Sequence, residues 1–138
     1  MKNEKISKLT VGHIVLLVSD LQRSMYFYSQ IGLPTYKSFD NTIAIIELLG
    51  GGHVLLVLKG SKDSEGMTQS SYGQLAKESF DFMLPEKSRE AVVKYRDNLA
   101  SLGIECSTIN EEPYFGHYYF QLEDPDKNII SIYSSHKF

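Results

Sequence analysis

A sequence pattern that predicts a strand followed by a helix occurs near the start of the chain and again in its second half. Residues 13–28 read HIVLLVSDLQRSMYFY, and residues 79–94, which lie 66 positions later, read SFDFMLPEKSREAVVK. Each copy has a short apolar run, then a polar helix-start signal, then apolar residues at helical spacing. Such a duplicated unit favours an α+β fold with internal symmetry. It leaves one difference to explain, because His13 in the first copy corresponds to Ser79 in the second.

The first copy opens a longer series of predicted elements. Its apolar run predicts a strand over residues 10–18, and LQRSMYFYSQI predicts a helix over residues 21–31. Ser19 or Asp20 is suited to cap this helix, and Gly32 is suited to end it. Three more strands are expected, at residues 35–39, 42–48 and 53–58. The order of elements is therefore βαβββ.

The second copy predicts the same order. A strand is expected at residues 79–84 and a helix at residues 86–101. The remaining strands are expected at residues 105–109, 117–122 and 129–134. A ferredoxin-like sandwich is the alternative α+β fold, but it lacks three consecutive strands after each helix.

The division of the chain follows from these elements. We predict one domain over residues 8–136, built from a module at residues 8–60 and a module at residues 79–136. The intervening residues 61–78 are rich in Ser, Lys, Gly and Gln, and this composition is typical of a solvent-exposed linker. Units of this size bury little surface alone, so an intimate pair of modules or a homodimer is expected.

Composition and charge limit the classes of partner that this chain is expected to bind. The formal net charge is −3, and no basic stripe is present, which disfavours nucleic-acid binding. The longest apolar runs are too short to span a bilayer. Cys106 is the single cysteine, which excludes an internal disulfide and fits a reducing compartment. We therefore expect a cytoplasmic protein that interacts with neither membranes nor nucleic acids.

Two stretches resemble a known family. The sequence from His13 through VSDLQRSMYFYSQIGL, together with the later QLEDPDKNIISIY, resembles the vicinal oxygen chelate superfamily, which includes glyoxalases, bleomycin resistance proteins and extradiol dioxygenases. Ile31 replaces the usual leucine, and Lys127 stands where glycine is common. The resemblance implies two βαβββ modules whose mixed sheets roll into a cup, often completed by exchange between the chains of a dimer.

The resemblance also implies positions for a divalent metal ion. Carried onto this sequence, they are His13, Leu55 or Leu56, Ser79 and Ser131. Leucine cannot donate to a metal, and a neutral serine hydroxyl is a poor ligand beside imidazole or carboxylate. We therefore predict no cofactor and disfavour a catalytic metal.

Other residues offer a displaced metal site or chemistry without metal. A shifted site would combine His13 with His53, Asp81 or His117. Without a metal, His13 is a candidate general base or hydrogen-bonding group, with Ser79, Asp81 and Ser131 as polar neighbours. A histidine on a buried strand is, however, often only a hydrogen-bonded core residue.

Aromatic residues provide another route to ligand binding. Tyr114, Phe115 and His117 precede the DPDKN turn and could hold a flat or cationic molecule by stacking. The helix residues Tyr26, Phe27 and Tyr28 are instead expected to pack against the sheet. The complete set of candidate ligand-binding residues is His13, His53, Leu55, Ser79, Asp81, Tyr114, Phe115, His117 and Ser131.

Three functions fit this sequence. The leading hypothesis is a protein that binds a small organic molecule in an aromatic cup without a catalytic metal. The second is a metal-dependent or His13-based lyase, isomerase, dioxygenase or thiol transferase of the same superfamily. The third is a non-catalytic structural or regulatory module, in which Leu55, Phe80 and Tyr133 fill the cup.

Overall fold

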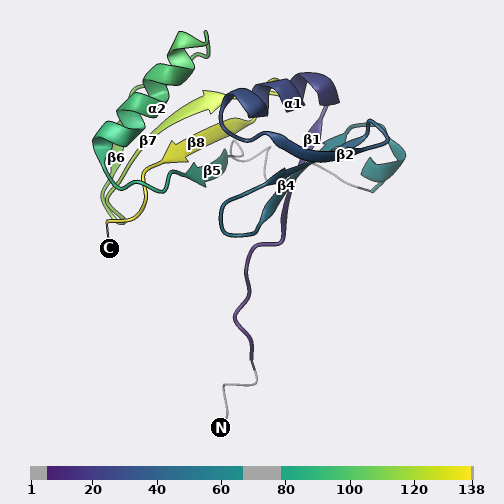
Figure 1. Cartoon of the computed structure of the whole chain (residues 1–138), viewed down its shortest axis with the longest axis horizontal. Coiled ribbons are helices and arrows are strands. Elements are labelled where there is room, and N and C mark those ends of the chain that lie inside the picture. The colour runs from purple at the N-terminus through teal and green to yellow at the C-terminus, as the bar shows by residue number, and fades with distance from the viewer. Residues whose placement is uncertain (1–5, 67–78, 138) are drawn as a thin grey trace. The chain divides into compact units, whose positions relative to one another are not determined.

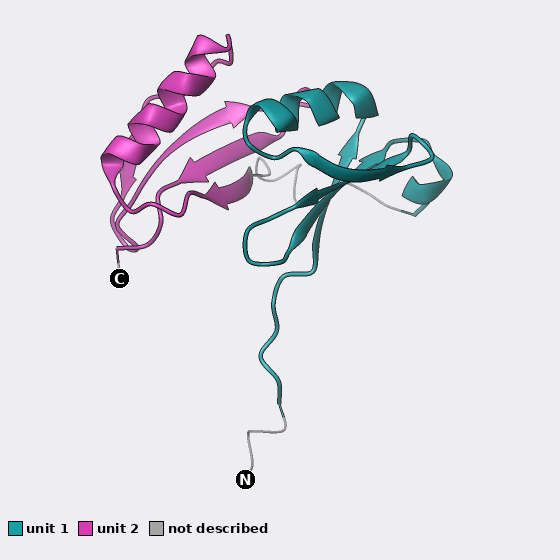
Figure 2. Cartoon of the chain, viewed as in Figure 1, with its two compact units in different colours: residues 1–67 teal, residues 68–138 magenta. Residues whose placement is uncertain are grey.

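The computed structural model describes residues 6–66 and 79–137. The chain divides into two compact units, residues 1–67 and 68–138 (Figure 2). Residues 67–78 of the predicted linker lie outside the described residues, and Lys62–Ser64 before them form a short 3-10 helix, η2. Within the described ranges no helix is long and apolar enough to cross a membrane.

The first unit is a four-stranded sheet with one helix (Figure 1). Its elements are β1 (His13–Val18), α1 (Leu21–Gln30), β2 (Thr35–Phe39), β3 (Ile43–Glu47) and β4 (His53–Leu58). The strand order is β1-β4-β3-β2, with β1 parallel to β4 and the other pairs antiparallel. Strand β1 begins three residues later than predicted.

The second unit repeats this topology. Its elements are β5 (Ser79–Met83), α2 (Arg89–Ser101), β6 (Asn110–Glu112), β7 (His117–Glu123) and β8 (Ile129–Tyr133). The strand order is β5-β8-β7-β6, and β5 is parallel to β8 as β1 is to β4. The α+β prediction of two βαβββ modules is confirmed, and the ferredoxin-like alternative is wrong because three strands follow each helix.

Helix α1 begins and ends as its sequence indicates. The Asp20 side chain accepts a hydrogen bond from the backbone N–H of Arg23 at 3.1 Å, which caps the first turn. Gly32 follows the helix with a φ of +92°, a conformation that favours glycine. Tyr28 is fully buried, but the prediction that Tyr26 also packs against the sheet is wrong, since Tyr26 is 67% exposed. The two positions are two residues apart and therefore face different sides of the helix.

Helix α2 begins three residues later than predicted. Its N-cap is Ser88, whose side chain accepts a hydrogen bond from the N–H of Ala91 at 3.2 Å. The carbonyl of Glu86, the predicted first residue, instead accepts a hydrogen bond from the N–H of Ser135 at 2.8 Å. Pairing with the segment after β8 therefore delays the start of the helix.

The predicted strand at residues 105–109 is wrong, and the edge strand β6 lies just beyond it. Asn110 pairs with Tyr119, so a regular antiparallel ladder would place Thr108 opposite Gln121. Instead, Ser107 donates its N–H to the Gln121 carbonyl at 2.9 Å, and its hydroxyl accepts the Gln121 N–H at 2.8 Å. A side-chain oxygen thus takes the place of a backbone carbonyl, and the ladder is interrupted.

The DPDKN turn between β7 and β8 is organised by Asp124, which is 4% exposed. Its Oδ1 accepts hydrogen bonds from the N–H groups of Asp126 at 2.9 Å and Asn128 at 2.8 Å. Its Oδ2 accepts one from the Asn128 side-chain amide at 2.9 Å. One carboxylate therefore fixes the turn that leads into β8, the strand that carries Tyr133 of the pocket described below.

Lys127 in this turn has a φ of +67°, which is unfavourable for a residue with a Cβ atom. Lys127→Gly is expected to raise the free energy of unfolding by about 0.5 to 1 kcal/mol, because relief of strain exceeds the added entropy of the unfolded chain. Urea denaturation measures the change. Lys127→Ala is the control, since it removes the charge but keeps the strain. An equal gain in both variants would contradict the explanation.

Candidate functional site

The candidate residues of the first unit meet at one end of its sheet. The parallel register places His13 of β1 beside His53 of β4, with ring centroids 6.0 Å apart and an edge-to-face arrangement. His13 is exposed and His53 is half-buried. Leu55 pairs with Val15, and these two residues lie two positions after His53 and His13, on the same face of the sheet. The two imidazoles are therefore neighbours, and Leu55 continues their row as an apolar surface.

The candidate serines of the second unit lie on neighbouring strands. Ser79 pairs with Ile129, and Ser131 pairs with Asp81 on one side and Gln121 on the other. Ser131 is fully buried, and its hydroxyl accepts a hydrogen bond from the Gln121 side-chain amide at 3.0 Å. This hydroxyl is therefore a structural contact between β7 and β8.

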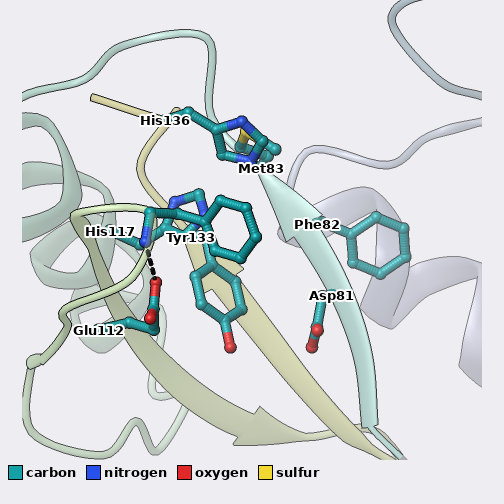
Figure 3. Close-up of a pocket in the computed structure, with 8 residues that line it drawn as sticks. Asp81, Phe82, Met83, Glu112, His117, Tyr133 and His136 are labelled. Carbon is teal, nitrogen blue, oxygen red and sulfur yellow. Dashed lines mark hydrogen bonds between the residues drawn. The ribbon is translucent and has the colours of Figure 1, made fainter. Parts of the chain in front are cut away.

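A pocket of about 380 Å³ lies in the second unit (Figure 3). Asp81 and Met83 are two residues apart on β5 and therefore point to the same face of the sheet, and Met83 pairs with Tyr133 of β8. Both strands therefore contribute to the pocket. The remaining lining comes from β5, β6, β7, the turn before β7 and the segment after β8. The lining residues are Asp81, Phe82, Met83, Glu112, Phe115, His117, Tyr133 and His136.

Four rings form one wall of this pocket, which we call the aromatic wall: Phe115, His117, Tyr133 and His136. Phe115 stacks on His136 with ring centroids 5.0 Å apart and an interplanar angle of 25°. The His117 ring is 4.7 Å from His136 and 5.0 Å from Tyr133, edge to face in both cases. These contacts hold flat surfaces ready for stacking against a ligand.

Glu112 fixes the turn that carries Phe115. Its two carboxylate oxygens accept hydrogen bonds from the backbone N–H groups of Tyr114 at 2.6 Å and Phe115 at 2.9 Å. Gly116 follows with a φ of +75°. The turn orients Phe115 into the aromatic wall, whereas Tyr114 is 88% exposed and does not line the pocket.

His117 is held in one tautomer. It is 6% exposed, and its Nδ1 lies 2.6 Å from the backbone carbonyl of Ser134. A carbonyl can only accept, so Nδ1 carries the hydrogen of the neutral imidazole. In a neutral ring the other nitrogen, Nε2, is then a hydrogen-bond acceptor.

The hydroxyl of Tyr133 lies in a negative environment. Burial raises the pKa of Tyr133, and the nearby Asp81, Tyr119 and Glu112 raise it further by disfavouring a second negative charge. In Figure 3 the Tyr133 ring extends between Glu112 and Asp81. The phenol therefore stays neutral at physiological pH and can donate a hydrogen bond.

The residues at the metal positions implied by the resemblance do not fit a divalent ion. Leu55 offers no donor atom, and the buried hydroxyl of Ser131 is already hydrogen-bonded to Gln121. Catalytic sites ordinarily use about three protein ligands. Among the described residues, no group of three or more His, Cys, Asp or Glu side chains is arranged to hold a metal ion.

The structure thus brings together three of the predicted site residues, Asp81, Phe115 and His117, in one pocket. It separately pairs His13 with His53 in the first unit. Sequence analysis did not predict Phe82, Met83, Glu112 or His136 as pocket residues, and it considered Tyr133 only as a residue that would fill the cup. Glu112 belongs to the mispredicted strand region, and His136 follows the last strand, where no side-chain periodicity indicates its direction.

A comparison with family models matches residues 10–132 to the Glyoxalase/Bleomycin resistance protein/Dioxygenase superfamily. No curated protein matches the chain significantly.

Solved structures share the fold at low sequence identity. A lactoylglutathione lyase from Agrobacterium tumefaciens has 18% identity and a TM-score of 0.71, and the match covers 93% of this chain and 95% of that one. A glyoxylase/bleomycin resistance protein/dioxygenase domain from Frankia sp. EAN1pec has 20% identity and a TM-score of 0.70, with coverages of 94% and 100%. A virulence protein from Salmonella typhimurium has 19% identity and a TM-score of 0.69, with coverages of 94% and 99%.

Proposed function

Because the chain belongs to the Glyoxalase/Bleomycin resistance protein/Dioxygenase superfamily, we propose that it binds a small organic molecule in the pocket of its second unit without a catalytic metal ion. The observation that carries the proposal is a pocket of about 380 Å³ that combines the aromatic wall with a few polar groups. Pockets of this size and make-up are typical of small-molecule sites. The poor donor set at the implied metal positions supports binding that is independent of metal.

The test is a fluorescence titration of EDTA-treated protein with 1-naphthylmethanol, a neutral planar probe. Phe115→Ala is expected to weaken binding about tenfold, because it removes a ring of the aromatic wall. Tyr114→Ala is the matched control, since the adjacent Tyr114 is exposed and does not line the pocket. Its affinity should stay within about twofold of the unchanged protein.

Two results would contradict the proposal. Equal losses in the two variants would show that the probe binds elsewhere. An affinity that appears only after stoichiometric Zn²⁺ or Mn²⁺ is added would contradict metal-independent binding.

We further propose that the modules at residues 8–60 and 79–136 act as one domain in a cytoplasmic homodimer. The small size of each module supports pairing, because units of this size bury little surface alone. The lone Cys106 supports a reducing compartment such as the cytoplasm. Sedimentation equilibrium at micromolar concentration is expected to give twice the 15.7 kDa mass of the chain.

A further inference from the structure

The pocket carries charge of only one sign when its histidines are neutral. Asp81 and Glu112 contribute carboxylates, and none of the described residues that line the pocket is lysine or arginine. Lys137 follows His136 in the sequence, but its ammonium nitrogen lies 5.3 Å from the ring centroid of Tyr118 and Lys137 is not a lining residue. The charges in the pocket therefore favour a positively charged ligand.

The raised pKa of Tyr133 indicates the same negative potential in the pocket. The carboxylates of Asp81 and Glu112 both contribute to the raised pKa of its phenol, after the larger effect of burial. An arrangement that disfavours a phenolate favours a cation in the same space, because the same charges act on both.

The hydrogen-bonding groups of the pocket are mostly acceptors. A carboxylate such as Asp81 only accepts, and in a neutral His117 ring Nε2 accepts because Nδ1 donates to the Ser134 carbonyl. The Tyr133 hydroxyl can also donate, and so can the ring N–H of His136. A ligand that carries several N–H donors satisfies more of these groups than a ligand that carries acceptors.

The aromatic wall also favours a ligand that contains a planar apolar group. The stacked rings of Phe115 and His136 present one face, and the Met83 side chain adds apolar surface nearby. Aromatic faces also attract cations through their quadrupole. A planar apolar group would contact this wall while an attached amine approaches the carboxylates.

We propose that the pocket selects an organic cation that has a planar apolar body and a primary ammonium or amidinium group. This inference rests on the proposed binding function and adds its charge class. Asp81 is the carboxylate whose charge can be tested without disturbing the Phe115 turn, because Glu112 holds that turn through two backbone hydrogen bonds.

The experiment compares three probes with the same ring system, measured by calorimetric titration of the full chain at pH 7.5 and low salt. They are 1-naphthylmethylammonium, neutral 1-naphthylmethanol and anionic 1-naphthoate. The cation is expected to bind at least tenfold more tightly than the alcohol, and the carboxylate at least tenfold more weakly.

Two variants test whether the preference for the cationic probe comes from the pocket. Asp81→Asn keeps the size of the side chain and should reduce the preference for the cation to about threefold, with Glu112 still charged. Asp97→Asn removes the same charge from an exposed position on α2, outside the pocket, and should leave the preference unchanged. Circular dichroism confirms that both variants are folded.

The outcomes separate the two proposals. If the neutral probe binds through Phe115 but all three probes bind equally, the charge inference is overturned while the binding function stands. An unchanged preference in Asp81→Asn, or an equal loss in Asp97→Asn, overturns the role of Asp81. If none of the probes binds at millimolar concentration, the proposed function itself is contradicted.

Discussion

Replacement of Asp124 by alanine is expected to lower the free energy of unfolding by about 3 to 4 kcal/mol. The buried carboxylate accepts two backbone N–H groups and one side-chain amide, and alanine leaves all three without this partner. Total stabilities of single domains are about 5 to 15 kcal/mol, so the loss would be a large fraction of the whole. Urea denaturation followed by circular dichroism measures it.

Two further variants test the cause. Asp124→Asn should cost less, because one oxygen can still accept both backbone N–H groups while its amide faces the amide of Asn128. Glu123→Ala, at the exposed neighbouring position, should change stability by about 0.5 kcal/mol or less. A similar loss for Asp124→Ala and Glu123→Ala would contradict the account of the turn.

Tyr28→Ala is expected to destabilise the protein by about 3 to 5 kcal/mol, because it leaves a cavity under α1. Tyr28 is fully buried and lies edge to face with Phe27, with ring centroids 5.3 Å apart. The loss should be visible as a lower midpoint in urea denaturation with an unchanged slope.

Tyr26→Ala is the matched control, since it makes the same chemical change two residues earlier in the same helix. Tyr26 is mostly exposed, and the expected loss is about 0.5 kcal/mol or less. Equal losses at the two positions would show that α1 does not pack through the face that carries Tyr28.

The order of elements could be predicted because local signals and side-chain periodicity agree over most of the chain. Asp20 and Gly32 bound α1 as their chemistry indicates, and three strand ranges in the first unit are correct to within one residue. The errors lie where a long-range contact overrides the local pattern. The Glu86 carbonyl pairs with Ser135, and the Ser107 hydroxyl substitutes for a backbone acceptor.

The candidate site could be predicted only in part. Asp81, Phe115 and His117 were predicted from a strand face and from clustered rings, and they line one pocket. His136 joins them because the segment after β8 continues beside the start of β7 and the turn before it: Ser134 donates its N–H to the Tyr118 carbonyl, and Lys137 donates its N–H to the Phe115 carbonyl. The proposed roles of His13 as a base and of His53 as a partner stay predictions.

The central claim is that a small molecule binds beside β5 and β8 without a metal ion. Methyl NMR of EDTA-treated protein labelled at methionine tests it directly, because Met83 lines the pocket and Met25 lies on α1. The account predicts that 1-naphthylmethylammonium shifts the Met83 signal, assigned with Met83→Leu, in a saturable way and leaves the Met25 signal in place. Saturable binding with no change at Met83 would contradict it.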